Sequence, residues 1–301
     1  MATETFSINA LKNRYDFALL FDVTDGNPNG DPDAGNMPRV DPETMHGFVT
    51  DVSLKRKVRD YVWVKTGGTS PHRIYVQHQS RSGTFLNAYH DEAHDNLVPP
   101  TPKADRAKPP AATKEAARQW MCKHFYDVRA FGAVMSTGTN AGQVRGPLQL
   151  TFARSIDAIS PTGVAITRVQ KTTVANETEM GNKNMIPYGL YLAHGFVSPS
   201  FAAQTGFTEA DLALFWQALL RMFEDDRSAS RGFMATRALI GFKHDSPLGN
   251  APVHELFDRV RISRKPGVEV ARQYQDYNVE IASDVPAGVT IIQPRPEYGP
   301  D

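Results

Sequence analysis

The sequence has little cysteine, no long apolar run and no excess of either charge. Its single cysteine, Cys122, excludes an internal disulfide and suits a reducing cytoplasm. No apolar run approaches the length that crosses a bilayer, so no membrane segment is predicted. The first six residues lack the basic start and apolar core of a signal peptide, and we expect a cytoplasmic protein.

The net charge is zero, with 33 basic and 33 acidic residues, which at first argues against a nucleic-acid-binding protein. The charges are unevenly distributed, however. Residues 1–51 carry 3 basic and 9 acidic side chains, whereas residues 52–130 carry 14 basic and 7 acidic ones. This asymmetry permits a cationic groove and head-to-tail association of copies, although ordinary variation along a soluble enzyme gives similar runs.

Hydrophobic residues make up 41% of the 301 residues and aromatic residues 10%, which is enough for a sizeable core. This length fits two modest domains or one domain with large insertions. The first clear element is a strand over residues 14–24, where apolar side chains alternate as in a half-buried strand. Its apolar face consists of Tyr15, Phe17, Leu19, Phe21 and Val23.

A basic helix is predicted over residues 51–65, where Thr50 and Asp51 are suitable N-cap residues. Residues 25–32, rich in Asn, Gly, Pro and Asp, form a loop before it. Three cationic side chains lie on one face of the helix: Lys55, Arg56 and Arg59. Such a face beside a sheet edge can bind a phosphate chain, and a solvated cationic surface is the alternative.

Several fragments carry a resemblance to a known family: Phe21-Asp22-Val23, Asn27-Pro28-Asn29-Gly30-Asp31-Pro32, Ser53-Leu54-Lys55-Arg56 with Arg59, Arg145-Gly146-Pro147, and residues 237–244. Together they resemble the backbone subunit of type I-C CRISPR Cascade, in the RAMP superfamily of guide-RNA binders. The resemblance implies a hand-shaped, non-catalytic protein that polymerises head to tail along guide RNA (crRNA). It also implies that the protein presents crRNA to a target DNA strand and contacts a crRNA-end-binding subunit and a large subunit.

The predicted elements follow a βαββαβ order, which predicts an α+β fold with a ferredoxin-like, RRM-like palm. The second helix begins with a capping box formed by Thr208 and Asp211. The predicted strands are residues 15–24, 128–135, 148–156 and 237–243, and the predicted helices are residues 51–65 and 208–223.

Large insertions are predicted within this single domain of residues 1–301. Residues 66–126 form a finger-like helical insertion, in which a proline-rich segment precedes a helix at residues 113–126. Residues 157–197 form a thumb-like β-hairpin, and residues 245–301 add short elements and a tail.

Residues 136–147 form a glycine-rich loop whose backbone N–H groups can approach a phosphate, with Arg145 as a source of charge. No Gly-Lys-Ser/Thr sequence closes the loop, so it is not a Walker motif. A flexible hairpin connection is the alternative. The choice between them stays open on the sequence alone.

The thumb is long for a simple connection, which favours a functional projection. Its strands are predicted at about residues 164–174 and 188–197, around a polar tip at residues 175–184. Arg168 and Lys171 can meet phosphates along the stem. The apolar side chains of Met180 and Met185 can wedge between unstacked bases, and the sequence does not decide which of them does so.

The full predicted set of RNA-binding residues is Arg39, Thr50, Ser53, Lys55, Arg56, Arg59, Gly142, Gln143, Arg145, Arg168, Lys171, Met180, Met185 and Arg231. No catalytic residue, metal ligand or cofactor is predicted.

Three alternatives involve metals. The segment from Asp25 to Gly30 matches half of an EF-hand loop, but Asn36 stands where the bidentate Glu belongs. His90 and His94 are spaced as in a zinc-protease helix, but the general-base Glu is missing. A metal-dependent endoribonuclease using Asp25, Asp31 and Asp33, in a cluster that also includes Asp22, would need a ligand geometry that the sequence does not indicate. A self-assembling structural protein with incidental basic patches also stays open.

Overall fold

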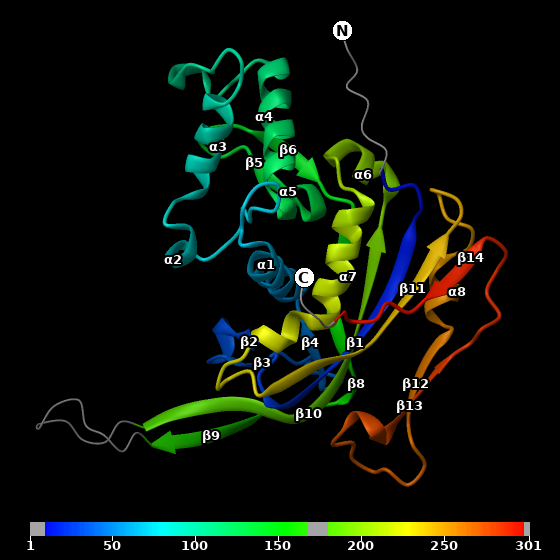
Figure 1. Ribbon diagram of the computed structural model, residues 1–301. Coiled ribbons are helices and arrows are strands. Elements are labelled where there is room, and N and C mark those ends of the chain that lie inside the picture. The colour runs from blue at the N-terminus through cyan, green and yellow to red at the C-terminus, as the bar shows by residue number, and fades with distance from the viewer. Residues whose placement is uncertain (1–9, 168–179, 298–301) are drawn as a thin grey trace, which may run out of the picture.

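The computed structural model describes residues 10–167 and 180–297, and its centre is an antiparallel sheet of long strands (Figure 1). The three central strands are β1 (Tyr15–Gly26), β10 (Met180–Val197) and β11 (Phe233–His244). Both neighbours of β1 run antiparallel to it, with Phe17 opposite Gly195 on one side and Gly241 on the other. The mixed α/β architecture with a large antiparallel sheet agrees with the predicted α+β class.

Shorter strands complete this sheet: β4 (His46–Val49), β7 (Leu148–Leu150), β8 (Ala153–Ala158), β9 (Thr162–Thr167) and β14 (Val289–Ile292). The strand order is β14-β11-β1-β10-β8-β4, and β7 and β9 also pair with β10. The predicted strand at residues 148–156 is therefore split, because Thr151 and Phe152 leave the ladder between β7 and β8. The predicted closing strand is longer than expected and is interrupted by a bulge beside Leu20.

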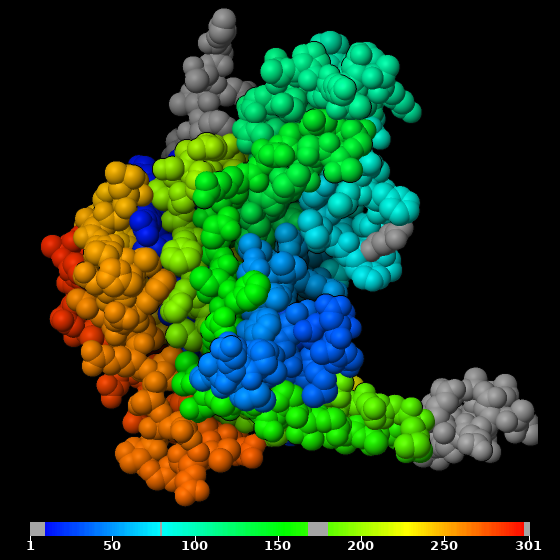
Figure 2. Space-filling model, turned by 180° about the vertical axis from the view of Figure 1, so that it is seen from behind, coloured from blue at the N-terminus to red at the C-terminus, as the bar shows by residue number. Residues whose placement is uncertain are grey.

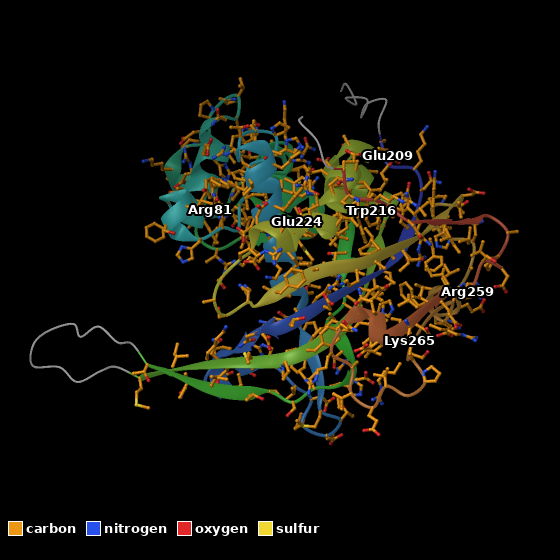
Figure 3. The ribbon with its side chains drawn as sticks, turned by 60° about the horizontal axis from the view of Figure 1, so that its bottom comes forward. Arg81, Glu209, Trp216, Glu224, Arg259 and Lys265 are labelled. Atoms are coloured by element: carbon orange, nitrogen blue, oxygen red, sulfur yellow. The ribbon has the colours of Figure 1, made fainter. Side chains whose placement is uncertain are left out.

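Two helices, α1 (Asp51–Thr66) and α7 (Glu209–Asp225), cover one face of the sheet (Figure 1), and both helices were predicted from the sequence. Figure 3 shows Trp216 and Glu224 on α7. The capping box of α7 is present, since Thr208 and Asp211 exchange side-chain-to-backbone hydrogen bonds. The ring of Phe17 packs edge-on against Trp216 at a centroid distance of 5.0 Å. A Cβ at Gly195 would lie 2.1 Å from this ring, so glycine makes the packing possible.

The opposite face of the sheet is covered by the C-terminal elements α8 (Val253–Phe257), β12 (Val260–Arg264) and β13 (Tyr277–Ile281). Figure 3 shows Arg259 and Lys265 in this part of the chain, next to the ends of β12. Ala18 and Leu20 belong to the same buried cluster as these elements. The prediction that β1 is half-buried was therefore wrong, because sequence periodicity does not reveal which distant segment covers a second face.

The segment after α1 builds a second, smaller core. Its helices are α2 (Gln79–Ser82), α3 (Leu86–Asp95), α4 (Ala111–His124) and α5 (Tyr126–Phe131). Two strands, β5 (Gly132–Met135) and β6 (Gly142–Arg145), pair with each other outside the main sheet. The predicted helix at residues 113–126 corresponds to α4.

The prediction of a strand over residues 128–135 was wrong for its first half. Its first half is helix α5, in which all six residues are buried, and only its second half is a strand. A short segment that is buried on every side shows no pattern that separates a helix from a strand, so periodicity could not distinguish them. This segment does not join the main sheet, and β10 is the strand that lies beside β1.

The thumb-like insertion contains the hairpin of β9 and β10, which projects from the body (Figure 1). β10 begins at Met180, so residues 180–184 of the predicted polar tip are strand, and residues 168–179 lie outside the described residues. The remaining short elements are β2 (Gly30–Asp31), η1 (Pro32–Ala34), β3 (Met37–Pro38), η2 (Lys103–Asp105), α6 (Pro199–Thr205) and η3 (Tyr274–Asp276). In the described part of the chain, no helix has the length and apolar character needed to cross a membrane.

Candidate nucleic-acid interface

The start of α1 is tied to the loop that follows β1. The Thr50 hydroxyl caps the helix by accepting a hydrogen bond from the N–H of Ser53 at 3.3 Å. The side-chain oxygen of Asn29 accepts bonds from both the N–H and the hydroxyl of Thr50, each at 3.0 Å. The N–H of Arg39 donates to the carbonyl of Asn29. The predicted residues Arg39, Thr50 and Ser53 therefore lie together at the positive end of a helix dipole.

The three predicted cations of α1 differ sharply in their exposure. Lys55 pairs with Asp51 at 2.9 Å, and its side chain is 14% exposed. The Nε of Arg59 lies 2.8 Å from the buried carboxylate of Asp127, and the Arg59 side chain is 11% exposed. Arg56, in contrast, is 63% exposed and makes a 3.6 Å ion pair with Asp60 along the helix. Of the three predicted cations, Arg56 is therefore the one that a ligand can reach most easily.

The glycine-rich loop is connected to α1 through Phe131. The side chains of Lys55 and Arg59 lie over the Phe131 ring, 5.7 Å and 5.2 Å from its centroid. The next residue, Gly132, is the β-ladder partner of Arg145. The structure thereby links the cationic helix to the strand that carries Arg145.

Within this loop, Gly142 has a φ of +85°, which favours glycine. Its N–H donates to the side chain of Asn140 at 2.9 Å, so this donor is used inside the loop. Gln143 and Arg145 are exposed on β6, and the Arg145 guanidinium lies 4.5 Å from the centroid of Phe201. The exposed side chains of β6 are therefore better placed for a ligand than the backbone of Gly142.

Two buried histidines, His90 and His94, hold the glycine-rich loop through its backbone carbonyls. The carbonyl of Thr139 accepts a bond from His90 Nδ1 at 2.8 Å, which leaves Nε2 to accept the Tyr75 hydroxyl at 2.8 Å. His94 Nε2 donates to the carbonyl of Asn140 at 3.0 Å. Burial lowers the pKa of His90, so the neutral ring is favoured. The histidine motif that resembles a zinc site is thus engaged in fixing a loop.

A second loop, residues 226–232, lies beside the loop after β1. Asp226 pairs with Lys57 of α1 and, at 3.1 Å, with Arg231. The N–H of Asn27 donates to the carbonyl of Ser230 at 2.8 Å. Lys57 is 2% exposed, and its burial lowers its pKa. The predicted residue Arg231 is therefore linked to α1 through Asp226 and the buried Lys57.

The thumb hairpin contacts this region at its base. The side-chain amide of Asn184 donates to the carbonyl of Gly35 at 2.8 Å. Met180 is 75% exposed, whereas Met185 is half-buried nearer the base of the arm. Exposure alone makes Met180 the more accessible apolar side chain. Two other predicted contacts lie outside the described residues: Arg168 and Lys171.

Two of the carboxylates considered for metal binding, Asp22 and Asp31, have other partners. Asp31 pairs with Arg39 at 3.4 Å. Asp22 is buried, lies 2.8 Å from Arg237 and accepts a bond from Tyr188. Within residues 10–167 and 180–297, no three His, Cys, Asp or Glu side chains converge on a common point that could hold a metal.

Sequence reasoning missed Asn29, Lys57 and Asp226 as parts of this interface. Asn29 lies in the motif from Asn27 to Pro32. Its role depends on its contact with Thr50, which is 21 residues away in the sequence and is brought close only by the fold. Lys57 is the cation of the helix that faces inward, which its spacing relative to Leu54 could have indicated. No sequence signal connects Asp226 to α1.

Comparisons with known proteins identify the family of this chain. A family model described as "CRISPR-associated protein Cas7" matches residues 13–282. A protein of Haloferax volcanii with the same description is 28% identical over 233 residues, covering 69% of this chain and 64% of the relative. The chain thus spans less than two thirds of that relative's length.

Two solved structures show partial similarity to this chain. One, titled "CRISPR RNA-guided surveillance complex, pre-nicking", has a TM-score of 0.49 and 14% identity, covering 76% of this chain and 78% of its own. The other, titled "CRISPR RNA-guided surveillance complex", has a TM-score of 0.46 and 15% identity, covering 76% and 68%.

Proposed function

Because this chain belongs to the Cas7 family of CRISPR-associated proteins, we propose that it is a crRNA-binding backbone subunit of a CRISPR surveillance complex. In this role, copies line up head to tail along the crRNA and present it to a target DNA strand for antiviral defence. Such a subunit works by holding RNA and has no catalytic activity or cofactor of its own. It acts in the cytoplasm and also contacts a crRNA-end-binding subunit and a large subunit.

The observation that carries the proposal is the family match over residues 13–282. That range contains the loop after β1, the start of α1 and the loop at residues 226–232, which contact one another. Phosphate binding needs cations and polar groups held in a fixed arrangement. The hydrogen bonds that Thr50 donates to Asn29 and the ion pair between Arg231 and Asp226 supply such an arrangement.

A finer assignment to the type I-C subtype rests on the motifs from Asn27 to Pro32 and from Ser53 to Arg59. We further propose a ferredoxin-like, RRM-like palm in a hand-shaped molecule. The adjacency of β11, β1, β10 and β8, with α1 and α7 on one face, supports that topology. The segment at residues 66–126 then serves as a finger, and the hairpin within residues 157–197 serves as a thumb.

The crRNA contacts divide by exposure in this proposal. Arg56, Gln143 and Arg145 meet phosphates directly, because their side chains are open to solvent. The others shape the site or meet RNA at its rim: Arg39, Thr50, Ser53, Lys55, Arg59, Gly142 and Arg231. The thumb adds Arg168 and Lys171 as phosphate contacts, and Met180 or Met185 as a wedge between bases.

The test is equilibrium binding of single-stranded RNAs of unrelated sequence at several salt concentrations. A double variant, Arg56→Gln with Arg145→Gln, should weaken binding to every sequence, by about tenfold near physiological salt. The slope of log K against log salt should fall by about 0.7 per lost contact. Arg261→Gln, on the exposed side of β12, is the matched control and should bind like the parent.

Two results would contradict the proposal. One is a purified parent protein that neither co-purifies with nucleic acid, judged by the absorbance ratio at 260 and 280 nm, nor binds added RNA. The other is binding that responds to RNA sequence but not to salt, because phosphate contacts are independent of sequence.

A further inference from the structure

A pair of phenylalanines, the half-buried Phe48 and the exposed Phe152, lies on the outer part of the sheet, on the face opposite α1 and α7. Val49 and Ala153 are fully buried in the core beneath the helices. Their preceding neighbours, Phe48 and Phe152, point the other way, because successive side chains of an extended chain alternate between the faces. Phe152 is 49% exposed. The two rings are nearly parallel, with an interplanar angle of 4° and a centroid distance of 6.1 Å.

The C-terminal elements that cover this face elsewhere do not bury the pair. Phe257 of α8 stacks on His194 of β10 at 4.0 Å and contacts Phe196. Leu20 and Leu256 lie in that covered cluster, whereas Phe152 remains half-exposed beyond it. Figure 2 shows the back of the molecule, where the segments around residues 45 and 155 lie beside the C-terminal elements and reach the surface.

A cation accompanies the rings. Arg154 is the β-ladder partner of Phe48, and its side chain is 61% exposed. Its 3.6 Å ion pair with Asp41 is exposed to water, where such pairs contribute little and can be replaced by a phosphate.

The pair is continuous with the candidate interface. The N–H of Phe48 donates to the carbonyl of Arg39 at 3.0 Å, and Thr50, which caps α1, follows two residues later. A single strand held at Arg39 and Thr50 therefore needs only to pass the edge strand β4 to reach Phe48.

We propose that Phe48 and Phe152 form a stacking platform for an unpaired base of single-stranded RNA, with Arg154 contacting the adjoining phosphate. This inference rests on the proposed function and adds a base-contacting surface to it. Parallel aromatic rings beside an exposed arginine on an antiparallel sheet are the combination that binds single strands without reading their sequence. An adenine, which stacks more strongly than a uracil, should gain more from it.

The experiment uses the full chain with fluorescently labelled oligo-rA and oligo-rU of equal length. Phe152→Leu should lose about tenfold in affinity for oligo-rA and less for oligo-rU, with an unchanged salt slope, because stacking releases no counterions. Phe152→Trp should restore oligo-rA binding. Arg154→Gln should lower the salt slope. Leu248→Ala, at another exposed apolar side chain, should change none of these values.

Several outcomes overturn the platform. One is an unchanged affinity of Phe152→Leu for oligo-rA, and another is a Phe152→Trp variant that does not restore this affinity. A third is an affinity loss that appears with DNA oligomers and not with RNA. Weaker self-association with unchanged RNA affinity would instead identify the rings as a protein contact. If the parent binds no RNA at all, the proposed function fails as well. If the parent binds RNA and Phe152→Leu matches it, only the platform fails.

Discussion

The Nε of Arg59 lies 2.8 Å from Oδ2 of Asp127, whose side chain is 1% exposed. The same carboxylate accepts the backbone N–H groups of Tyr75 and Val76 at 2.8 and 3.0 Å. Asp127 thus joins helix α1, the chain after it and helix α5 at one point. An RNA contact by Arg59 would have to use its remaining N–H groups at the rim, so its removal affects the fold as well as any ligand.

Arg56→Gln and Arg59→Gln should therefore separate binding from stability. Arg59→Gln weakens the bond to a buried carboxylate and should lower the free energy of unfolding by roughly 1.5–3 kcal/mol. Arg56→Gln removes an exposed side chain and should leave stability within about 0.5 kcal/mol, while weakening RNA binding. Chemical denaturation and RNA titration of both variants measure the two effects. Equal stability losses would show that the Asp127 junction is not structural.

The long, strongly patterned elements of this fold were predictable from the sequence. The helix after Thr50 and the capping box at Thr208 obey local rules, and both are present. The helix over residues 126–131 was predicted as a strand, because a fully buried segment carries no alternation that distinguishes the two. Secondary structure could thus be predicted where one side of an element faces water and the other faces the core.

The interface depended more heavily on long-range contacts. Lys55, Arg56 and Arg59 were assigned to one cationic face, but only the fold determines that Asp127 occupies Arg59. Likewise, Phe48 and Phe152 lie more than 100 residues apart, and their parallel rings follow from the pairing of β4 with β8. No pattern of spacing within one segment carries that information.

The pair of His90 and Tyr75 should make stability depend on pH. Burial lowers the pKa of His90 from its ordinary value of 6.5. The unfolded chain therefore binds more protons as pH falls below 6.5, and the stabilising contribution of the neutral ring, complete above that value, is progressively lost. The loss is at most about 1.4 kcal/mol per pH unit for one group.

The control variant is His90→Gln, because an amide can donate to the Thr139 carbonyl and accept the Tyr75 hydroxyl without titrating. Between pH 7.5 and 5.5, urea denaturation should show a larger loss of stability in the parent than in the variant. Other titrating groups are shared by both proteins and cancel in the difference. Equal pH dependence in the two proteins would rule out a contribution from His90.

RNA and single-stranded DNA should remain intact when incubated with the pure protein and magnesium or manganese. Asp31 is paired with Arg39, and Asp22 with Arg237, and among the described residues no group of acidic or histidine side chains converges as two-metal cleavage requires. Gel analysis of labelled strands over several hours measures this. Cleavage that disappears in Asp25→Ala or Asp31→Ala would place the protein among the metal-dependent endoribonucleases.

Shortening the thumb should impair assembly on RNA without unfolding the protein. Thr167 and Met180 are partners at the end of the described hairpin, so an Asn-Gly turn can join them in place of residues 168–179. If the arm reaches across the joint between copies, this variant should coat long RNA in shorter arrays and with less cooperativity than the parent. Electron microscopy of the arrays and the steepness of RNA titrations measure both effects. The double variant Arg168→Gln with Lys171→Gln separates the loss of charge from the loss of length. It should lower the salt slope of RNA binding and leave the array length closer to that of the parent. A shortened protein that assembles as completely as the parent would show that the arm is dispensable for polymerisation.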